Sequence, residues 1–156
     1  MTEAASRRAL VADLLPILSP EVLCHLPPSL QLSQSPEAVE GWIDARAAES
    51  DVYLIRTSAD GALIGLLILA SDPEARTPPR LHIGYLLGKT AWGQGYASEM
   101  IGGLLAACAR PVTLMGGVAE DNPASARVLK KHGFRLRRDL SGDGMEIYAV
   151  HLKVPG

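Results

Sequence analysis

The chain has 156 residues, 47% of them hydrophobic, with 15 basic and 17 acidic side chains and a formal net charge of −2. This length and apolar content fit a real hydrophobic core, so we expect residues 1–156 to form a single domain. The slightly acidic balance gives no global basic field, which argues against nucleic acid as the default partner. No apolar run reaches the length of a membrane span, so we expect no membrane partner.

The two cysteines, Cys24 and Cys108, are far apart in the sequence. Cys24 lies in a proline-flanked segment and Cys108 on the apolar face of a predicted helix, which favours buried thiols over a disulfide. This usage is typical of a reducing cytosol. Near the N-terminus, Asp13 and Pro16 interrupt the apolar run and no small-residue cleavage site follows, which argues against a signal peptide. The expected location is cytoplasmic.

Prolines divide the first fifty residues into short apolar pieces. Ser19-Pro20-Glu21 and Ser35-Pro36-Glu37 each place a capping serine before a proline that suits the first helical position. The sequence therefore predicts two helices here, the second ending near Ala48.

Strands follow this helical region. The β-branched and aromatic run from Val52 to Thr57, the turn from Ser58 to Gly61 and the apolar run from Ala62 to Ala70 predict an antiparallel hairpin. A polar, proline-bearing loop from Asp72 to Pro79 leads to a further predicted strand from Arg80 to Leu87.

A glycine-rich loop, Trp92-Gly93-Gln94-Gly95-Tyr96-Ala97, joins this strand to an amphipathic helix predicted from Ala97 to Ala109. The helix would bury one face, made of Ala97, Met100, Ile101, Leu104, Leu105 and Cys108. A helix start carries unpaired N–H groups and partial positive charge, and glycines let a phosphate approach them. A Gly-x-Gly pair alone is a weak signal, but its place between a strand and a helix favours an anion cradle.

The C-terminal part alternates strands and helices. Val112 to Val118 predicts a strand, and a helix starts after Asn122, with Asp121 as an alternative cap. Gly133 predicts a left-handed end to that helix. Two further strands, Phe134 to Leu140 and Met145 to Leu152, would form a closing hairpin.

Four segments together resemble the successive signatures of the GNAT superfamily of acyl-CoA-dependent N-acetyltransferases, and within it the branch like ribosomal-protein N-acetyltransferases. They are Ile83-Gly84-Tyr85-Leu86-Leu87, Trp92-Gly93-Gln94-Gly95-Tyr96-Ala97-Ser98-Glu99, Asn122-Pro123-Ala124-Ser125 and Lys131-His132-Gly133-Phe134. The resemblance covers roughly Val52 to Leu152. It implies an α+β fold with helices flanking a central mixed, mostly antiparallel sheet that is splayed between its fourth and fifth strands. The usual opening strand is hard to see in Arg8 to Leu15, so we expect residues 1–50 to be a divergent helical region on the acceptor side.

The resemblance implies acetyl-CoA as cosubstrate and no metal. Loop amides would hold the pyrophosphate, and those residues are Gly93, Gln94, Gly95, Tyr96, Ala97 and Ser98. The backbones of Leu86 and Leu87 would pair with the pantetheine arm. Three side chains have two interpretations each: Trp92 packs beside the cofactor or anchors the loop, Asn122 contacts pantetheine or only caps its helix, and Lys130 meets the 3′-phosphate or is solvated.

Acetyl transfer to an amine needs a base for the ammonium, a donor to the oxyanion and an acid for the leaving thiolate. His82 stands where relatives carry a glutamate base, and it is otherwise a half-exposed strand histidine. Glu120 is the second candidate base, or a solvated loop carboxylate. The tyrosine that relatives use as the acid corresponds to Leu129, so Ser125 is the substitute, unless it only supports the helix start. The family implies direct attack by a primary amine, from a protein N-terminus or a small molecule, in a ternary complex.

Two other functions stay open. The missing tyrosine and the abbreviated N-terminal region fit a non-catalytic module that binds acetyl-CoA. The glycine loop could also serve another nucleotide, but a dinucleotide fold would place its glycines near the first strand, with an acidic residue about twenty positions later. The fold is compatible with a homodimer through an apolar sheet edge or the last strands, and the sequence does not identify the acceptor amine.

Overall fold

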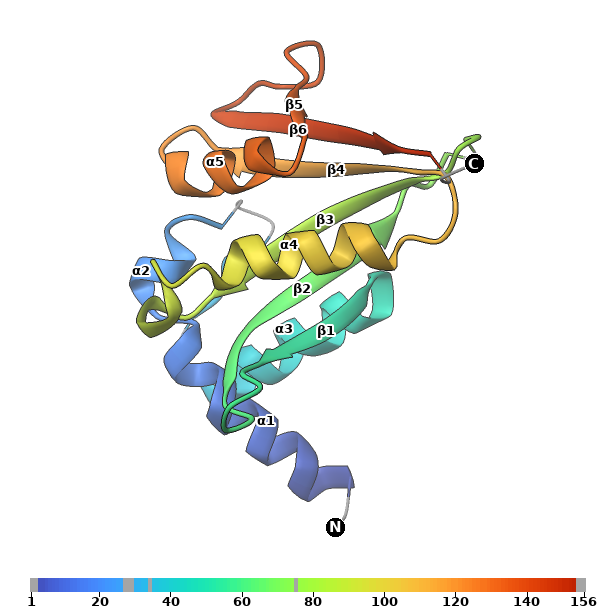
Figure 1. Cartoon of the computed structure of the whole chain (residues 1–156). Coiled ribbons are helices and arrows are strands. Elements are labelled where there is room, and N and C mark those ends of the chain that lie inside the picture. The colour runs from blue at the N-terminus through green and yellow to red at the C-terminus, as the bar shows by residue number, and fades with distance from the viewer. Residues whose placement is uncertain (1–2, 27–29, 34, 75, 154–156) are drawn as a thin grey trace. The chain divides into compact units, whose positions relative to one another are not determined.

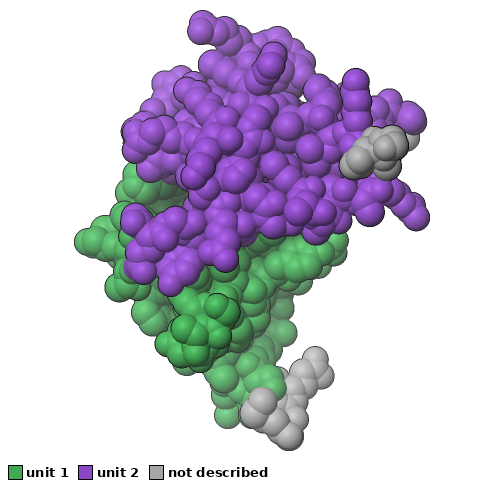
Figure 2. Space-filling model, viewed as in Figure 1, with its two compact units in different colours: residues 1–68, 85–92 green, residues 69–84, 93–156 purple. Residues whose placement is uncertain are grey.

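The computed structural model describes residues 3–26, 30–33, 35–74 and 76–153. They form two compact units, residues 1–68 with 85–92 and residues 69–84 with 93–156, which Figure 2 colours separately. The division passes through two strands, β2 (Leu63–Ser71) and β3 (Arg80–Leu87). The expectation of a single domain stays a prediction.

The described strands form one sheet in the order β1-β2-β3-β4-β6-β5 (Figure 1). The remaining strands are β1 (Asp51–Arg56), β4 (Val112–Ala119), β5 (Arg135–Leu136) and β6 (Met145–Leu152). β3 and β4 are parallel, from Arg80 opposite Thr113 to Ile83 opposite Gly116, and both strands continue beyond this register. β6 pairs antiparallel with β4 and with β5. The predicted α+β fold with a mixed, mostly antiparallel sheet is confirmed.

A helix, α1 (Glu3–Ile17), occupies the region where the opening strand was sought. Its apolar side chains explain the difference, because Val11, Leu14, Ile17 and Leu18 are buried at helical spacing rather than alternating. Pro16 lies in the last turn of the helix, where it has no N–H to donate to the Ala12 carbonyl four residues earlier. The parallel pair therefore joins the third and fourth strands of this chain, not the fourth and fifth.

The two serine–proline segments start helices of different length. α3 (Pro36–Glu49) has the predicted cap, because the Ser35 hydroxyl accepts a hydrogen bond from the Ala38 N–H at 3.2 Å. α2 (Pro20–Leu23) is a single turn, and Ser19 makes no cap bond within the described structure. α1, α2 and α3 give residues 1–50 the helical character that the sequence predicts, apart from positions 1–2, 27–29 and 34, which lie outside the described residues.

The first unit also contains the predicted hairpin between β1 and β2. The Thr57 N–H donates to the Ala62 carbonyl at 3.0 Å, and Gly61 has a left-handed φ of 71° in the turn. Its core consists of side chains from the helices and the strands, among them Leu14, Val39, Trp42, Leu66 and Leu86. A short 3₁₀ helix, η2 (Lys89–Ala91), ends this unit next to Trp92.

The second unit contains α4 (Tyr96–Ala107), α5 (Pro123–Lys131), β4 and β6, and α5 lies beside these two strands (Figure 1). α5 packs closely on β4, because a Cβ at Gly116 would lie 3.2 Å from Leu129 Cδ1. The same Cβ would lie 3.4 Å from Cγ1 of Ile83 on the neighbouring strand β3. Of the predicted apolar face of α4, Ile101 is fully buried. Within the described residues, no helix combines the length and the apolar character needed to cross a bilayer.

Two local expectations are wrong. The strand predicted from Phe134 to Leu140 is only Arg135–Leu136, because the chain then turns and the Leu140 N–H donates to the Arg137 carbonyl at 3.1 Å. Both cysteines are free, but Cys24 is exposed rather than buried because it follows the single turn of α2. Cys108 is half-buried, and burial raises the pKa of its thiol.

Candidate active site

The loop before α4 turns on two glycines. Gly93 and Gly95 have left-handed φ angles of 72° and 82°, which side-chain-bearing residues rarely adopt. A Cβ added at either position would meet no described atom within 4 Å, so the space beside both glycines is open. Gly95 is the N-cap of α4 and, as a glycine, has no side chain with which to cap this helix start. The start of α4 therefore fits an anion that approaches the backbone N–H groups directly.

One hydrogen bond ties the first turn of α4 to the end of α5. Ser98 Oγ lies 2.9 Å from His132 Nε2, and His132 follows the last residue of α5. The imidazole lies against Gly102, where a Cβ would be 3.2 Å from His132 Cε1. Ser98 and His132 belong to two sequence motifs 34 positions apart, and neither motif indicates that the two side chains meet.

Trp92 acts as an anchor for the segment that enters the loop. Its Nε1–H donates to the Leu87 carbonyl at 2.9 Å, and its ring meets the edge of the His25 ring with centroids 6.1 Å apart. Leu86 and Leu87 are themselves buried at the end of β3. Of the two interpretations of Trp92, the structure shows the anchoring contact, and a contact with the cofactor stays a prediction.

Asn122 caps α5, because its Oδ1 accepts a hydrogen bond from the Ser125 N–H at 3.3 Å. The cap is therefore Asn122 and not Asp121, and a ligand contact by Asn122 stays a prediction. Leu129, where the resemblance would place a tyrosine, is only 1% exposed and belongs to the core. Lys130 Nζ lies 5.7 Å from the centre of the Tyr148 ring, a cation–π contact that competes with a role in phosphate binding.

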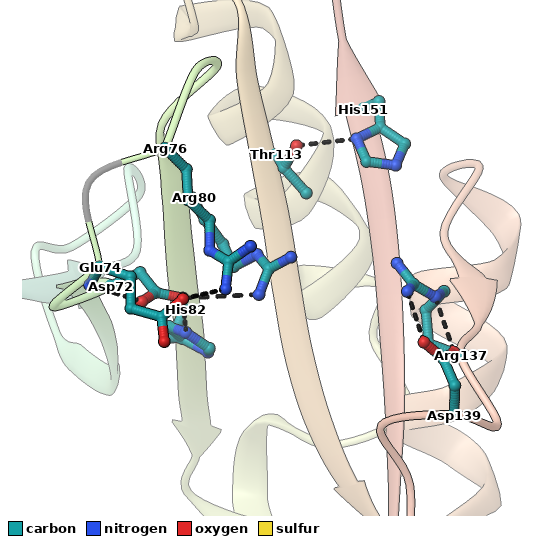
Figure 3. Close-up of polar contacts among 9 residues, drawn as sticks. All are labelled: Asp72, Glu74, Arg76, Arg80, His82, Thr113, Arg137, Asp139 and His151. Carbon is teal, nitrogen blue, oxygen red and sulfur yellow. Dashed lines mark hydrogen bonds and ion pairs between the residues drawn. The ribbon is translucent and has the colours of Figure 1, made fainter.

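His82 has a carboxylate partner that the sequence analysis missed. Figure 3 shows that His82 and Arg80, both on β3, point toward Asp72, which directly follows β2. His82 Nε2 lies 3.3 Å and Arg80 Nη1 3.6 Å from Asp72 Oδ2. We read residues 72–79 as a polar loop, and only the backbone bond from the Asp72 N–H to the Arg80 carbonyl, at 3.1 Å, shows why Asp72 faces β3.

The predicted catalytic side chains come from three different places. His82 lies within the parallel register, opposite Met115. It lies on the sheet face opposite α5, because its neighbour Ile83 faces Gly116 and Leu129 and strand side chains alternate. Glu120 is exposed beyond the end of β4, and Ser125 is in the first turn of α5. The roles of all three stay predictions.

The comparisons with known proteins agree with this architecture. A family profile described as an acetyltransferase (GNAT) domain matches residues 6–135. No curated protein sequence matches the chain.

Solved structures with similar folds include two proteins that act on ribosomal L7/L12. RimL, a ribosomal L7/L12 alpha-N-protein acetyltransferase in complex with coenzyme A, is 20% identical with a TM-score of 0.74, over 99% of this chain and 93% of that chain. An acetyl transfer enzyme from Salmonella typhimurium that modifies the N-terminal serine of L7/L12 is 22% identical with a TM-score of 0.72, over 97% and 92%.

A third similar structure is a phosphinothricin acetyltransferase from Sinorhizobium meliloti in complex with AcCoA. It is 15% identical with a TM-score of 0.64, over 97% of this chain and 86% of that chain. At these identities the three structures show a common fold, and the family profile covers most of the sequence. The chain therefore belongs to the GNAT family of acetyltransferases.

Proposed function

We propose that this chain transfers the acetyl group of acetyl-CoA to a primary amine by direct attack in a ternary complex. The observation that carries this proposal is the start of α4, where Gly93 and Gly95 have left-handed φ angles and the space beside both residues is open. Membership of an acetyltransferase family and similar structures with bound coenzyme A or AcCoA support it. We also propose a cytoplasmic location.

In this proposal the pyrophosphate of acetyl-CoA binds the backbone N–H groups from Gly93 to Ser98. A diphosphate at a helix N-terminus needs donors and close approach more than a side-chain cation. The bond from Trp92 to Leu87 holds the preceding segment. The backbones of Leu86 and Leu87 pair with the pantetheine arm, and Asn122 and Lys130 are the proposed side-chain contacts.

The bound thioester supplies an activated acyl group. The amine must first lose a proton, because an ammonium has no lone pair with which to attack. We propose that His82, whose side chain is 48% exposed, accepts this proton. The exposed Glu120 is the alternative base. When the carbon–sulfur bond breaks, the thiolate takes up a proton, and we propose Ser125 as its donor.

A specific observation favours a second candidate, a module that binds acetyl-CoA without transferring the acetyl group. Leu129 is buried and apolar where the resemblance places the thiolate's acid. Binding and turnover must therefore be measured separately.

Isothermal titration with acetyl-CoA tests the cofactor site in the wild type, in Gly95→Trp and in a matched control, Gly61→Trp. Gly61 is also left-handed, with a φ of 71°, and a Cβ there would also meet no described atom within 4 Å. Both substitutions place a side chain at a left-handed φ, but Gly61 belongs to the turn between β1 and β2. We expect Gly95→Trp to abolish binding and Gly61→Trp to preserve it.

The next measurement is an amine screen by mass spectrometry with the wild type and His82→Ala. Acetylated product that decreases in His82→Ala supports the transferase. Binding without acetylation of any protein N-terminus, polyamine, amino acid or antibiotic amine favours the non-catalytic module. A folded wild type that does not bind acetyl-CoA contradicts both functions.

A further inference from the structure

Asp72 is held in place from three directions. Its Oδ1 accepts a hydrogen bond from the Glu74 N–H at 3.0 Å, and its Oδ2 faces Arg80 and His82. Its own N–H donates to the Arg80 carbonyl, which fixes the start of the loop against β3. The Asp72 side chain is only 10% exposed, whereas that of His82 is 48% exposed. A fixed carboxylate therefore stands behind an imidazole that reaches solvent.

Asp72 is a carboxylate at neutral pH. The Glu74 N–H lowers the pKa of the Asp72 carboxyl, burial opposes that shift, and His82 and Arg76 lower it further. An ionised carboxylate is only an acceptor of hydrogen bonds, so the imidazole nitrogen that faces it must carry a proton. That nitrogen is Nε2.

We propose that Asp72 is a positioning residue for His82, which keeps the proton on Nε2 and leaves Nδ1 as the nitrogen that accepts a proton from the amine. The proposal rests on the proposed function, in which His82 is the base. In the step, the ammonium N–H bond breaks and its proton forms a bond with Nδ1, giving an imidazolium whose positive charge the carboxylate stabilises. The neutral amine then attacks the thioester.

The surroundings of His82 leave Asp72 as the carboxylate that faces its imidazole. On β3 and the preceding loop, the charged residues are Asp72, Glu74, Arg76 and Arg80, and Arg76 is paired with Glu74. Across the sheet, the β4 residues in the parallel register, Thr113 to Gly116, carry no titratable side chain. Arg80 shares Asp72 Oδ2 and keeps the carboxylate in place when the imidazole is neutral.

The tautomer of His82 tests the geometry without any assay of activity. The measurement uses the ¹⁵N chemical shifts of full-length labelled protein at a pH at which histidines are neutral. We expect His82 Nδ1 to have the chemical shift of an unprotonated ring nitrogen and Nε2 that of a protonated one. His82→Gln assigns the signals among the four histidines. Asp72→Asn should mix the two tautomers, and Asp139→Asn should not change them, because Asp139 is paired with Arg137 in the turn after β5.

Kinetics tests whether the pair serves the reaction. We expect Asp72→Asn to lower kcat about 10-fold or more and to leave the KM for acetyl-CoA unchanged. The expected loss is a part of the rate acceleration that a general base supplies. Adding Asp72→Asn to His82→Ala should lower the rate no further.

The outcomes separate this proposal from the function on which it rests. An Nε2 without a proton in the wild type, or a tautomer unchanged in Asp72→Asn, overturns the positioning role even if His82 is the base. Full activity in His82→Ala overturns the catalytic assignment of His82 and with it the role of Asp72 in turnover. A tautomer change in Asp72→Asn together with a lower kcat supports both.

Discussion

The glycine loop and the Asp72–His82 pair differ in what builds them. At the start of α4, backbone conformation makes the proposed anion site, with left-handed φ angles at Gly93 and Gly95. Around His82, side chains ten positions apart meet across the turn between two strands. A backbone site depends on small residues at fixed local positions, whereas a side-chain site depends on the fold that brings its members together. We therefore expect the glycine loop to be sensitive to added side chains and the Asp72–His82 pair to be sensitive to the loss of a side chain.

The largest effect is expected from adding a side chain to the loop. Gly93→Val places a β-branched residue at a φ of 72°, which costs about 1–3 kcal/mol of strain and puts methyl groups where the diphosphate would lie. We expect acetyl-CoA affinity to fall about 100-fold. Removing a side chain at the adjacent position, in Gln94→Ala, should change affinity only a few-fold, as measured by calorimetry.

Gly61→Val is the matched control for this comparison, because Gly61 has a φ of 71°. It should lose folding stability without losing affinity. A Gln94→Ala variant that binds as poorly as Gly93→Val would show that side chains, and not backbone, make the site.

A smaller effect is expected where a side chain supports the backbone site. The bond between Ser98 Oγ and His132 Nε2 holds the first turn of α4, and one hydrogen bond contributes about 0.5–1.5 kcal/mol. His132→Ala should therefore weaken acetyl-CoA binding by about 3- to 10-fold, with kcat retained. Ser98→Ala should give a similar loss, and the double variant no more than either alone. Additive losses would mean that the two residues act independently.

The same contrast explains what the sequence could predict. The strand from Arg80 to Leu87 and the start of α5 after Asn122 were placed correctly, because alternation, caps and glycines are local signals. Helix α1 was missed because prolines dominated the interpretation of its flanks, although Leu14 and its buried neighbours follow a helical period.

The parts of the site that the sequence could not predict depend on long-range contacts. The loop glycines were identified from the sequence, but the partners of Ser98 and His82 were not. Those partners, His132 and Asp72, depend on how helices and strands pack, and neither carries a local mark of its role. Trp92 had two local interpretations, and only the position of the Leu87 carbonyl shows the anchoring contact.

The smallest effect concerns the contribution of the Asp72 charge to folding stability. The folded structure lowers the pKa of Asp72, chiefly through the Glu74 N–H, so the folded state favours the carboxylate more than the unfolded state does. The charge of Asp72 therefore stabilises the folded state at pH values above about 3.9, the pKa of an aspartate in the unfolded chain. This stabilisation is lost as the pH falls through the lower pKa of Asp72 in the folded state. Wild type should resist urea better than Asp72→Asn at pH 7, and the two unfolding midpoints should converge as the pH falls below about 4. If the difference between the two unfolding midpoints stays constant across this pH range, the lower stability of Asp72→Asn comes from packing. Asp72 would then support the loop without acting through its charge on His82.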